Sequence, residues 1–233
     1  MMHNKETNWK KYEKAGLSLI LLFILVNAII NKDSIVALIS AICGITYTFL
    51  AGKGLPKCYL FGVAGSSFYC WLSFQSALWG NLLLYAAYYI PMQIIGYFRW
   101  NKNLKKDKKE IIKTSLNKKE MFLLISLLSV VSIIVYFILL KLNDAHPILD
   151  SITTVFSIGG MYLTVRRAIE QWIFWMVVNT LSLIMWINVI LSGTKAYSTA
   201  IMWAVYLYLA VYFYIEWKKE IKQNIKHDQI EVI

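Results

Sequence analysis

The chain has 233 residues, of which 58% are hydrophobic and only 16% charged, and its formal net charge is +11. Soluble domains carry about a quarter of charged residues, and apolar runs of about twenty residues, long enough to cross a bilayer, recur along this sequence. The composition therefore excludes a soluble globular protein and leaves no room for a separate soluble domain. In a membrane chain, positive charge is typical of basic loops that set orientation, so we expect no nucleic-acid partner.

The apolar runs predict an all-α integral membrane protein with eight transmembrane helices. The predicted spans are 15–31, 34–52, 58–76, 80–99, 120–140, 148–165, 169–191 and 197–216. The first span follows four lysines and resembles a signal peptide. No clear small-x-small cleavage site follows it, so we expect a retained helix.

The basic residues predict the orientation of the chain. If both termini face the cytoplasm, 21 of the 24 Lys and Arg residues lie on the cytoplasmic side, and only Lys32, Lys141 and Lys195 lie on the other. The bias holds at every loop, as positive-inside sorting requires. The lysine-rich segment 101–119 is then a cytoplasmic loop near anionic headgroups, for which orientation or lipid contact is favoured over a specific binding site.

A shift of 117 residues aligns parts of the sequence with one another. The matched pairs are Ser34/Ser151, Ile35/Ile152, Ser40/Ser157, Ala87/Ala204, Tyr89/Tyr206, Tyr97/Tyr214, Trp100/Trp217 and Lys102/Lys219. Units offset by four helices have the same orientation in the membrane. The pattern predicts a single domain over 1–233 in a 1+3+1+3 layout: an extra helix 15–31, a three-helix bundle 34–99, a linker helix 120–140 and a second bundle 148–216. Such parallel repeats are typical of SWEET-like transporters.

Polar and aromatic residues form a stripe on the predicted helix 169–191. The stripe consists of Trp172, Trp175, Asn179, Ser182 and Trp186, which follow one another at spacings of three and four and so share one face. Asn179 is about 15 Å from the helix start, near the middle of a core about 30 Å thick. Trp172 and Trp186 also fit an interfacial aromatic belt, whereas Trp175 and Asn179 are too deep for one. Their spacing leaves two roles open, namely contact with a neighbouring helix or one wall of a site for a small, flat, polar ligand.

Span 80–99 carries Tyr89 and Gln93 on one face, with Pro91 between them. Proline removes a backbone hydrogen bond, which membrane helices tolerate where a cavity or a neighbouring helix compensates. Tyr89 and its repeat mate Tyr206 both fall near mid-membrane. They either close a pocket or take part in ordinary aromatic packing.

Small residues predict where helices approach closely. Gly62 and Gly65 share a face of span 58–76, and Gly44 and the pair Gly159–Gly160 lie at mid-depth in their spans. Gln75, near the outer end of span 58–76, is either a polar cap or part of an entry path.

The sequence lacks the residues that ion coupling, metal binding and catalysis usually require. No Asp, Glu, Lys, Arg or His lies well inside a predicted span, although ion-coupled carriers usually bury such groups. Sodium sites made of backbone and hydroxyl oxygens stay open, but the pattern favours an uncoupled facilitator. The three cysteines form no CxxC pair and the three histidines are isolated, so we expect no metal and no cofactor. No nucleophile has a neighbouring base and no phosphate loop occurs, so we do not expect an enzyme.

Two motifs resemble those of a known family. The runs Glu170-Gln-Trp172-x-x-Trp175-x-x-x-Asn179 and Pro91-Met-Gln93-x-x-Gly96-x-x-x-Trp100 are similar to the PnuC family of bacterial nicotinamide riboside (vitamin B3) transporters. The eight-span layout agrees over essentially the full length. The resemblance implies a SWEET-like fold, a homotrimer in the bacterial inner membrane, and facilitated diffusion with trapping of the riboside by cytosolic phosphorylation.

The resemblance also implies substrate contacts. Trp172, Trp175 and Asn179 follow from the motif, and Gln75 and Gln93 from position. The flat pyridinium cation of the riboside suits indole faces, and its carboxamide can pair with Asn179. The rival hypotheses are a transporter of the same fold for thiamine or riboflavin, and a membrane scaffold or sensor without transport.

The final predicted helix departs from the motif. Trp217 matches Trp100 of the first repeat, but the run from Leu209 to Trp217 has neither Pro nor Gly. We therefore expect no symmetric function for this helix.

Overall fold

The structure is a computed structural model that describes residues 10–31, 34–75, 79–105, 110–143, 146–193 and 197–230. These residues form helices, and the only β-structure among them is two isolated bridges, Leu104 with Ile111 and Thr114 with Ala168. The all-α class predicted from the apolar runs is confirmed. The chain divides into two units, Met1–Ile112 and Lys113–Ile233.

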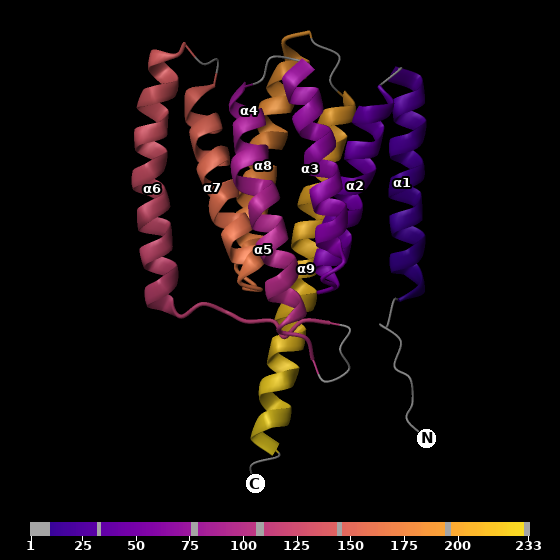
Figure 1. The fold of residues 1–233 in the computed structure, drawn as a ribbon, viewed down its shortest axis with the longest axis vertical. Coiled ribbons are helices and arrows are strands. Elements are labelled where there is room, and N and C mark those ends of the chain that lie inside the picture. Colours follow the sequence, from indigo (N-terminus) through magenta and orange to yellow (C-terminus); the bar gives the residue numbers. More distant parts are fainter. Residues whose placement is uncertain are drawn as a thin grey trace. The chain divides into compact units, whose positions relative to one another are not determined.

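Unit 1 contains the first five α-helices and one π-helical turn. They are α1 (Lys11–Asn31), α2 (Ile35–Gly52), α3 (Cys58–Gln75), α4 (Trp79–Leu84), η1 (Tyr85–Tyr89) and α5 (Ile90–Asn101). Helix α1 packs on α2, α2 on α3, and α3 on α4, η1 and α5 (Figure 1). Helix α3 is therefore the centre of this unit.

Close backbone approach joins α2 to α3. A Cβ added at Gly65 would lie 3.0 Å from Cβ of Cys43, and the Ser40 hydroxyl donates to the Gly65 carbonyl over 3.1 Å. At Gly62 the added Cβ would meet the Tyr47 ring at 2.9 Å. The predicted role of these glycines in close packing is confirmed.

A buried ion pair fixes the start of α1. Glu13 is 4% exposed, and its carboxylate accepts from the Lys53 ammonium over 2.6 Å and from the Lys10 backbone N–H over 2.8 Å. Lys53 is the C-cap of α2. The pair therefore ties α1 to the loop between α2 and α3.

Unit 2 contains α6 (Lys118–Lys141), α7 (Pro147–Val165), α8 (Gln171–Leu191) and α9 (Tyr197–Ile230). Each helix packs on the next, and Leu128, Val155, Leu163 and Phe174 belong to one core cluster. Gly159 permits this packing, because an added Cβ would overlap Leu128 and Phe174. Helix α9 is the longest and continues well past the end of α8 that begins at Gln171 (Figure 1).

Each of the eight predicted spans corresponds to helix where the structure describes it, although α2 begins at Ile35 and α8 at Gln171, slightly later than predicted. Five of the described helices, α1, α2, α6, α7 and α9, are long and apolar enough to cross a membrane by length and composition. Span 80–99 is less regular than expected, because Pro91 has no N–H and the preceding turn widens, with the Ile90 N–H bonded to the Tyr85 carbonyl. The last helix extends 14 residues beyond the predicted end at 216, to Ile230, since this polar stretch is rich in the good helix formers Lys, Glu and Gln.

Candidate functional site

The tryptophan stripe lies on α8, the helix that packs against both α7 and α9. Trp172, Asn179 and Ser182 are buried, with 2%, 5% and 4% exposure, whereas Trp175 remains partly exposed. The predicted helix is confirmed. Trp172, Trp175 and Asn179 lie within two turns of it.

Trp172 contacts α9. Its ring centroid is 5.5 Å from that of Phe213 and 5.6 Å from that of Trp217, which it meets edge to face. Its indole N–H is buried without a hydrogen-bond partner among the described residues. Burial inside the α8–α9 contact, rather than an interfacial belt, is what the structure shows for this residue.

Trp175 lies against α7. Its indole N–H donates to the Thr164 hydroxyl over 3.3 Å, and a Cβ added at Gly160 would lie 3.1 Å from its ring. The indole therefore packs directly on the backbone of Gly160, and its nitrogen is hydrogen-bonded to Thr164. The Trp175 side chain remains partly exposed.

Asn179 places a polar group in apolar surroundings near the middle of α8. Asn179 is 5% exposed. Its carboxamide offers both a donor and an acceptor at this depth.

In unit 1, Gln93 of α5 is 4% exposed and exchanges hydrogen bonds with the Ser66 hydroxyl of α3 over 3.1 and 3.2 Å. Tyr89 is 7% exposed and ends the π-helical turn, with its ring 4.7 Å from that of Tyr85. Gln75 is exposed at the last residue of α3. Gln93 and Tyr89 thus lie one helical turn apart, whereas Gln75 is on a different helix.

Tyr206, the predicted repeat mate of Tyr89, is on α9 and is partly exposed. Its ring centroid is 6.0 Å from that of Trp203, one turn earlier on the same helix. The indole N–H of Trp203 has no hydrogen-bond partner among the described residues.

The glycine and tryptophan of the Pro91–Trp100 motif have a common partner, Tyr59 of α3. A Cβ at Gly96 would overlap the Tyr59 ring, and the same ring meets Trp100 edge to face at 5.0 Å. Gly96 and Trp100, one turn apart on α5, therefore both pack against the ring of Tyr59. Sequence reasoning missed Tyr59, because nothing in its own neighbourhood marks it as the partner of a residue 37 positions later.

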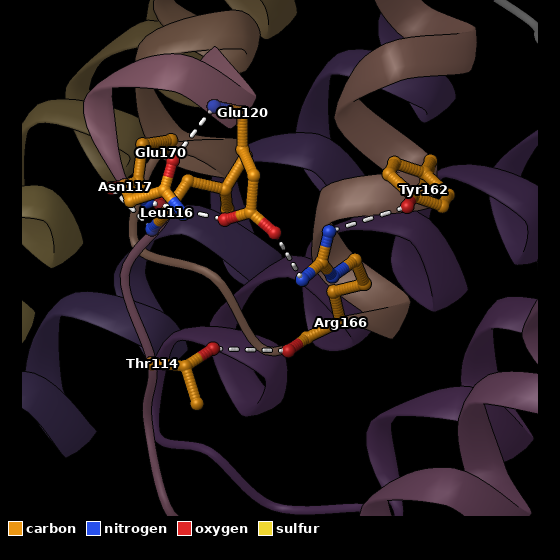
Figure 2. Close-up of polar contacts among 7 residues, drawn as sticks. All are labelled: Thr114, Leu116, Asn117, Glu120, Tyr162, Arg166 and Glu170. Atoms are coloured by element: carbon orange, nitrogen blue, oxygen red, sulfur yellow. Dashed lines mark hydrogen bonds and ion pairs between the residues drawn. The ribbon is translucent and has the colours of Figure 1, made fainter. Parts of the chain in front are cut away.

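A polar network holds the start of α8. Figure 2 shows Glu170, the N-cap of α8, accepting from the Leu116 backbone N–H over 3.0 Å, and Arg166 lying between Glu120 at 3.5 Å and the Tyr162 hydroxyl at 3.3 Å. Thr114 donates its hydroxyl hydrogen to the Arg166 carbonyl over 3.1 Å. The segment before α6 is thus bound to the α7–α8 loop.

The charges around Glu170 oppose one another. Burial raises the pKa of Glu170, and the Glu120 carboxylate adds to this, while the Leu116 N–H and Arg166 lower it. Burial is the largest influence, so the pKa lies above its usual value. One carboxylate oxygen of Glu170 is buried without a hydrogen-bond partner in the part of the chain that the structure describes.

Comparison with known proteins identifies the family. The sequence model of the family described as nicotinamide mononucleotide transporter matches residues 34–219, which include the whole of both motifs. The chain belongs to the nicotinamide mononucleotide transporter family. It is therefore a member of a transporter family and not of an enzyme family, as the missing catalytic residues predict.

Relatives of this chain are similar to it in sequence over nearly its whole length. The nicotinamide riboside transporter PnuC of Neisseria mucosa is 33% identical over 221 residues, covering 93% of this chain and 84% of that protein. The transporter of the same name from Haemophilus influenzae is 28% identical and covers 94% of each chain.

A solved structure is similar over the same length. The crystal structure of the vitamin B3 transporter PnuC has a TM-score of 0.80 and 30% identity, and covers 94% of this chain and 96% of that one. The resemblance stated from the two motifs is confirmed.

Proposed function

We propose that this protein carries nicotinamide riboside across the bacterial inner membrane by facilitated diffusion. The single observation that supports this most strongly is the buried carboxamide of Asn179 on the same face as Trp172 and Trp175, in a chain similar over 93% of its length to a riboside transporter. A pyridinium cation held by indoles gains about 0.5–2 kcal/mol for each contact. Asn179 adds one amide hydrogen bond, worth about 1 kcal/mol net.

The proposed substrate-contact residues of unit 2 are Trp172, Trp175, Asn179 and Tyr206. The residues that we predicted in unit 1 are Gln75, Gln93 and Tyr89. We propose that Trp175 and Asn179 contribute most to substrate binding, because Trp175 is partly exposed and Asn179 is a buried polar group. Gln93 would have to exchange its bonds with Ser66 for bonds to the ligand.

We further propose that the helices form two parallel repeats in a SWEET-like layout. Two pairs of matching features support this. Tyr59 and Trp172, each the second residue of its helix, meet Trp100 and Trp217 edge to face, and these tryptophans are 117 residues apart. The loops agree too: Gly54 and Arg167 both have a positive φ, and their carbonyls accept from the Ile111 and Thr114 N–H groups over 3.0 Å.

The proposed orientation has both termini in the cytoplasm, from the distribution of Lys and Arg. The proposed assembly is a homotrimer, as the family resemblance implies. No charged residue lies in the middle of a predicted span, so we propose uptake without a coupled ion, driven by cytosolic phosphorylation of the riboside.

Liposomes test transport directly. Purified protein is reconstituted into vesicles that contain a riboside kinase and ATP, and labelled riboside is added outside. Accumulation above that in protein-free vesicles, lost when kinase or ATP is omitted, is the expected result. No accumulation would favour a scaffold or sensor, and accumulation driven only by a sodium or proton gradient would refute uncoupled uptake. Thiamine and riboflavin serve as competitors, and preferred uptake of either would reassign the substrate.

A further inference from the structure

We propose that Thr164 is a positioning residue for the substrate, which acts by fixing the rotation of the Trp175 indole. The inference rests on the proposed function, because it takes Trp175 to be the ring on which the substrate lies. It assigns a role to a residue of α7 that lies outside both sequence motifs.

The direction of the hydrogen bonds supports this role. The Thr164 hydroxyl donates its one hydrogen to the Gly160 carbonyl, 2.8 Å away, and this leaves its lone pairs for the indole N–H of Trp175 at 3.3 Å. Threonine in a helix often bonds back to the carbonyl four residues earlier. Here that common bond also orients the hydroxyl as an acceptor toward a second helix.

The surroundings leave the indole little freedom. Thr164 is 1% exposed, so its hydroxyl is buried between the helices that it joins. Gly160 lies one turn before Thr164 and has no side chain, so the indole packs directly on its backbone. A Cβ added at Gly160 would lie 3.1–3.4 Å from three ring atoms of Trp175. A ring supported at Gly160 and bonded at its nitrogen keeps one orientation. Preorganisation of this kind lowers the cost of binding a flat ligand.

Two substitutions separate the hydroxyl from the volume of the side chain. Thr164→Val keeps the shape but removes the acceptor, whereas Thr164→Ser keeps the acceptor and removes a methyl group. We expect Thr164→Val to weaken nicotinamide riboside binding about three- to tenfold, the usual effect of one lost hydrogen bond, and Thr164→Ser to bind as the wild type. A role in packing alone predicts the reverse order.

Thr153→Val is a matched control on the same helix. Its hydroxyl makes the same kind of bond, to the Leu149 carbonyl over 2.8 Å, and no hydrogen bond to an indole is seen among the described residues. We expect this variant to bind the riboside as the wild type does.

Calorimetric titration of the purified full chain and the indole N–H signals of ¹⁵N-tryptophan-labelled protein are measured together. Trp175→Phe assigns the signal. In Thr164→Val this signal should move upfield while Thr164→Ser leaves it in place, and affinity should fall only in the first. If the signal moves and affinity is unchanged, or if Ser weakens binding as much as Val, the positioning role is overturned.

The same experiment separates failure of this inference from failure of the proposed function. If Trp175→Ala binds the riboside normally, the proposed contact and the positioning role are both wrong. If wild-type protein binds no riboside while its thermal unfolding is cooperative, the proposed substrate is wrong. Thermal unfolding of each variant identifies a loss of folding, in which case Thr164→Ser and the indole signal still decide the question.

Discussion

Replacing Gly96 with alanine tests how the Pro91–Trp100 motif works. In the structure the α5 backbone at Gly96 lies directly against the Tyr59 ring, and an alanine Cβ would come within 2.6 Å of the tyrosine oxygen, closer than real contacts allow. The ring must therefore shift, and with it the edge-to-face contact with Trp100 at 5.0 Å. Overpacking of this kind costs about 1–3 kcal/mol and a disturbed aromatic pair about 0.5–1.5 kcal/mol. Alanine returns about 1 kcal/mol through its higher helix propensity.

The net expectation is a loss of about 1–3 kcal/mol, which for a chain of this length lowers the Tm by roughly 5 °C. Thermal unfolding of detergent-purified protein measures it. Gly16→Ala in α1 is the matched control, because an added Cβ there meets nothing within 4 Å, and its Tm should be unchanged or higher. In a Tyr59→Ala background, Gly96→Ala should no longer destabilise. The reasoning is refuted if Gly96→Ala and Gly16→Ala unfold at the same temperature.

Three further variants test other contacts. Because burial raises the pKa of Glu170, the folded chain holds a proton at pH values where the unfolded chain has released it. The stabilising contribution of this group is therefore fully present at low pH and is lost as the pH rises through the raised pKa. Glu170→Gln should gain Tm relative to wild type as the pH rises above the ordinary pKa of a glutamate, and a difference that is constant with pH would contradict this. Glu220 forms an ion pair with Lys113, whose side chain is 5% exposed, so Glu220→Ala should lower the free energy of chemical unfolding by about 2–3 kcal/mol. Glu216 pairs with Lys219, whose side chain is 65% exposed, so Glu216→Ala should lower it by less than about 1 kcal/mol. Ser66→Ala removes the partner of both amide atoms of Gln93 and should lower stability by about 1–3 kcal/mol, and an unchanged midpoint would show that another group replaces the hydroxyl.

The helices were predictable because the bilayer sets the length of each apolar run, and each run begins or ends near a lysine, an arginine or a small residue. The stripe on α8 was predictable because helical periodicity alone decides which residues share a face. The same holds for the close packing at Gly62 and Gly65, since small residues at this spacing let backbones approach.

The partners of these residues were not predictable. Trp172 and Trp217 are 45 positions apart and Tyr59 and Gly96 are 37 apart, and no local pattern pairs residues at such separations. Arg166 illustrates the limit well. The sequence marks it as a basic loop residue, and only the structure places it between Glu120 and Tyr162.

The π-helical turn ending at Tyr89 was also outside sequence reasoning. Pro91 indicated an interruption but not its form, because a kink, a break and a widened turn all satisfy the missing N–H. The helix end at Ile230 was missed for a different reason, since hydropathy marks where a helix leaves the membrane and not where it stops.

Calorimetric titration of nicotinamide riboside into wild-type protein and Asn179→Leu tests the central claim most directly. Leucine fills a similar volume on the buried face of α8, so the variant should fold with a Tm equal to or above that of wild type. We predict that wild-type protein binds the riboside in preference to thiamine and riboflavin. We predict that Asn179→Leu binds it at least tenfold more weakly, since a hydrogen bond is lost and the ligand amide is left unpaired. Equal affinity for the riboside in the two folded proteins would contradict the account.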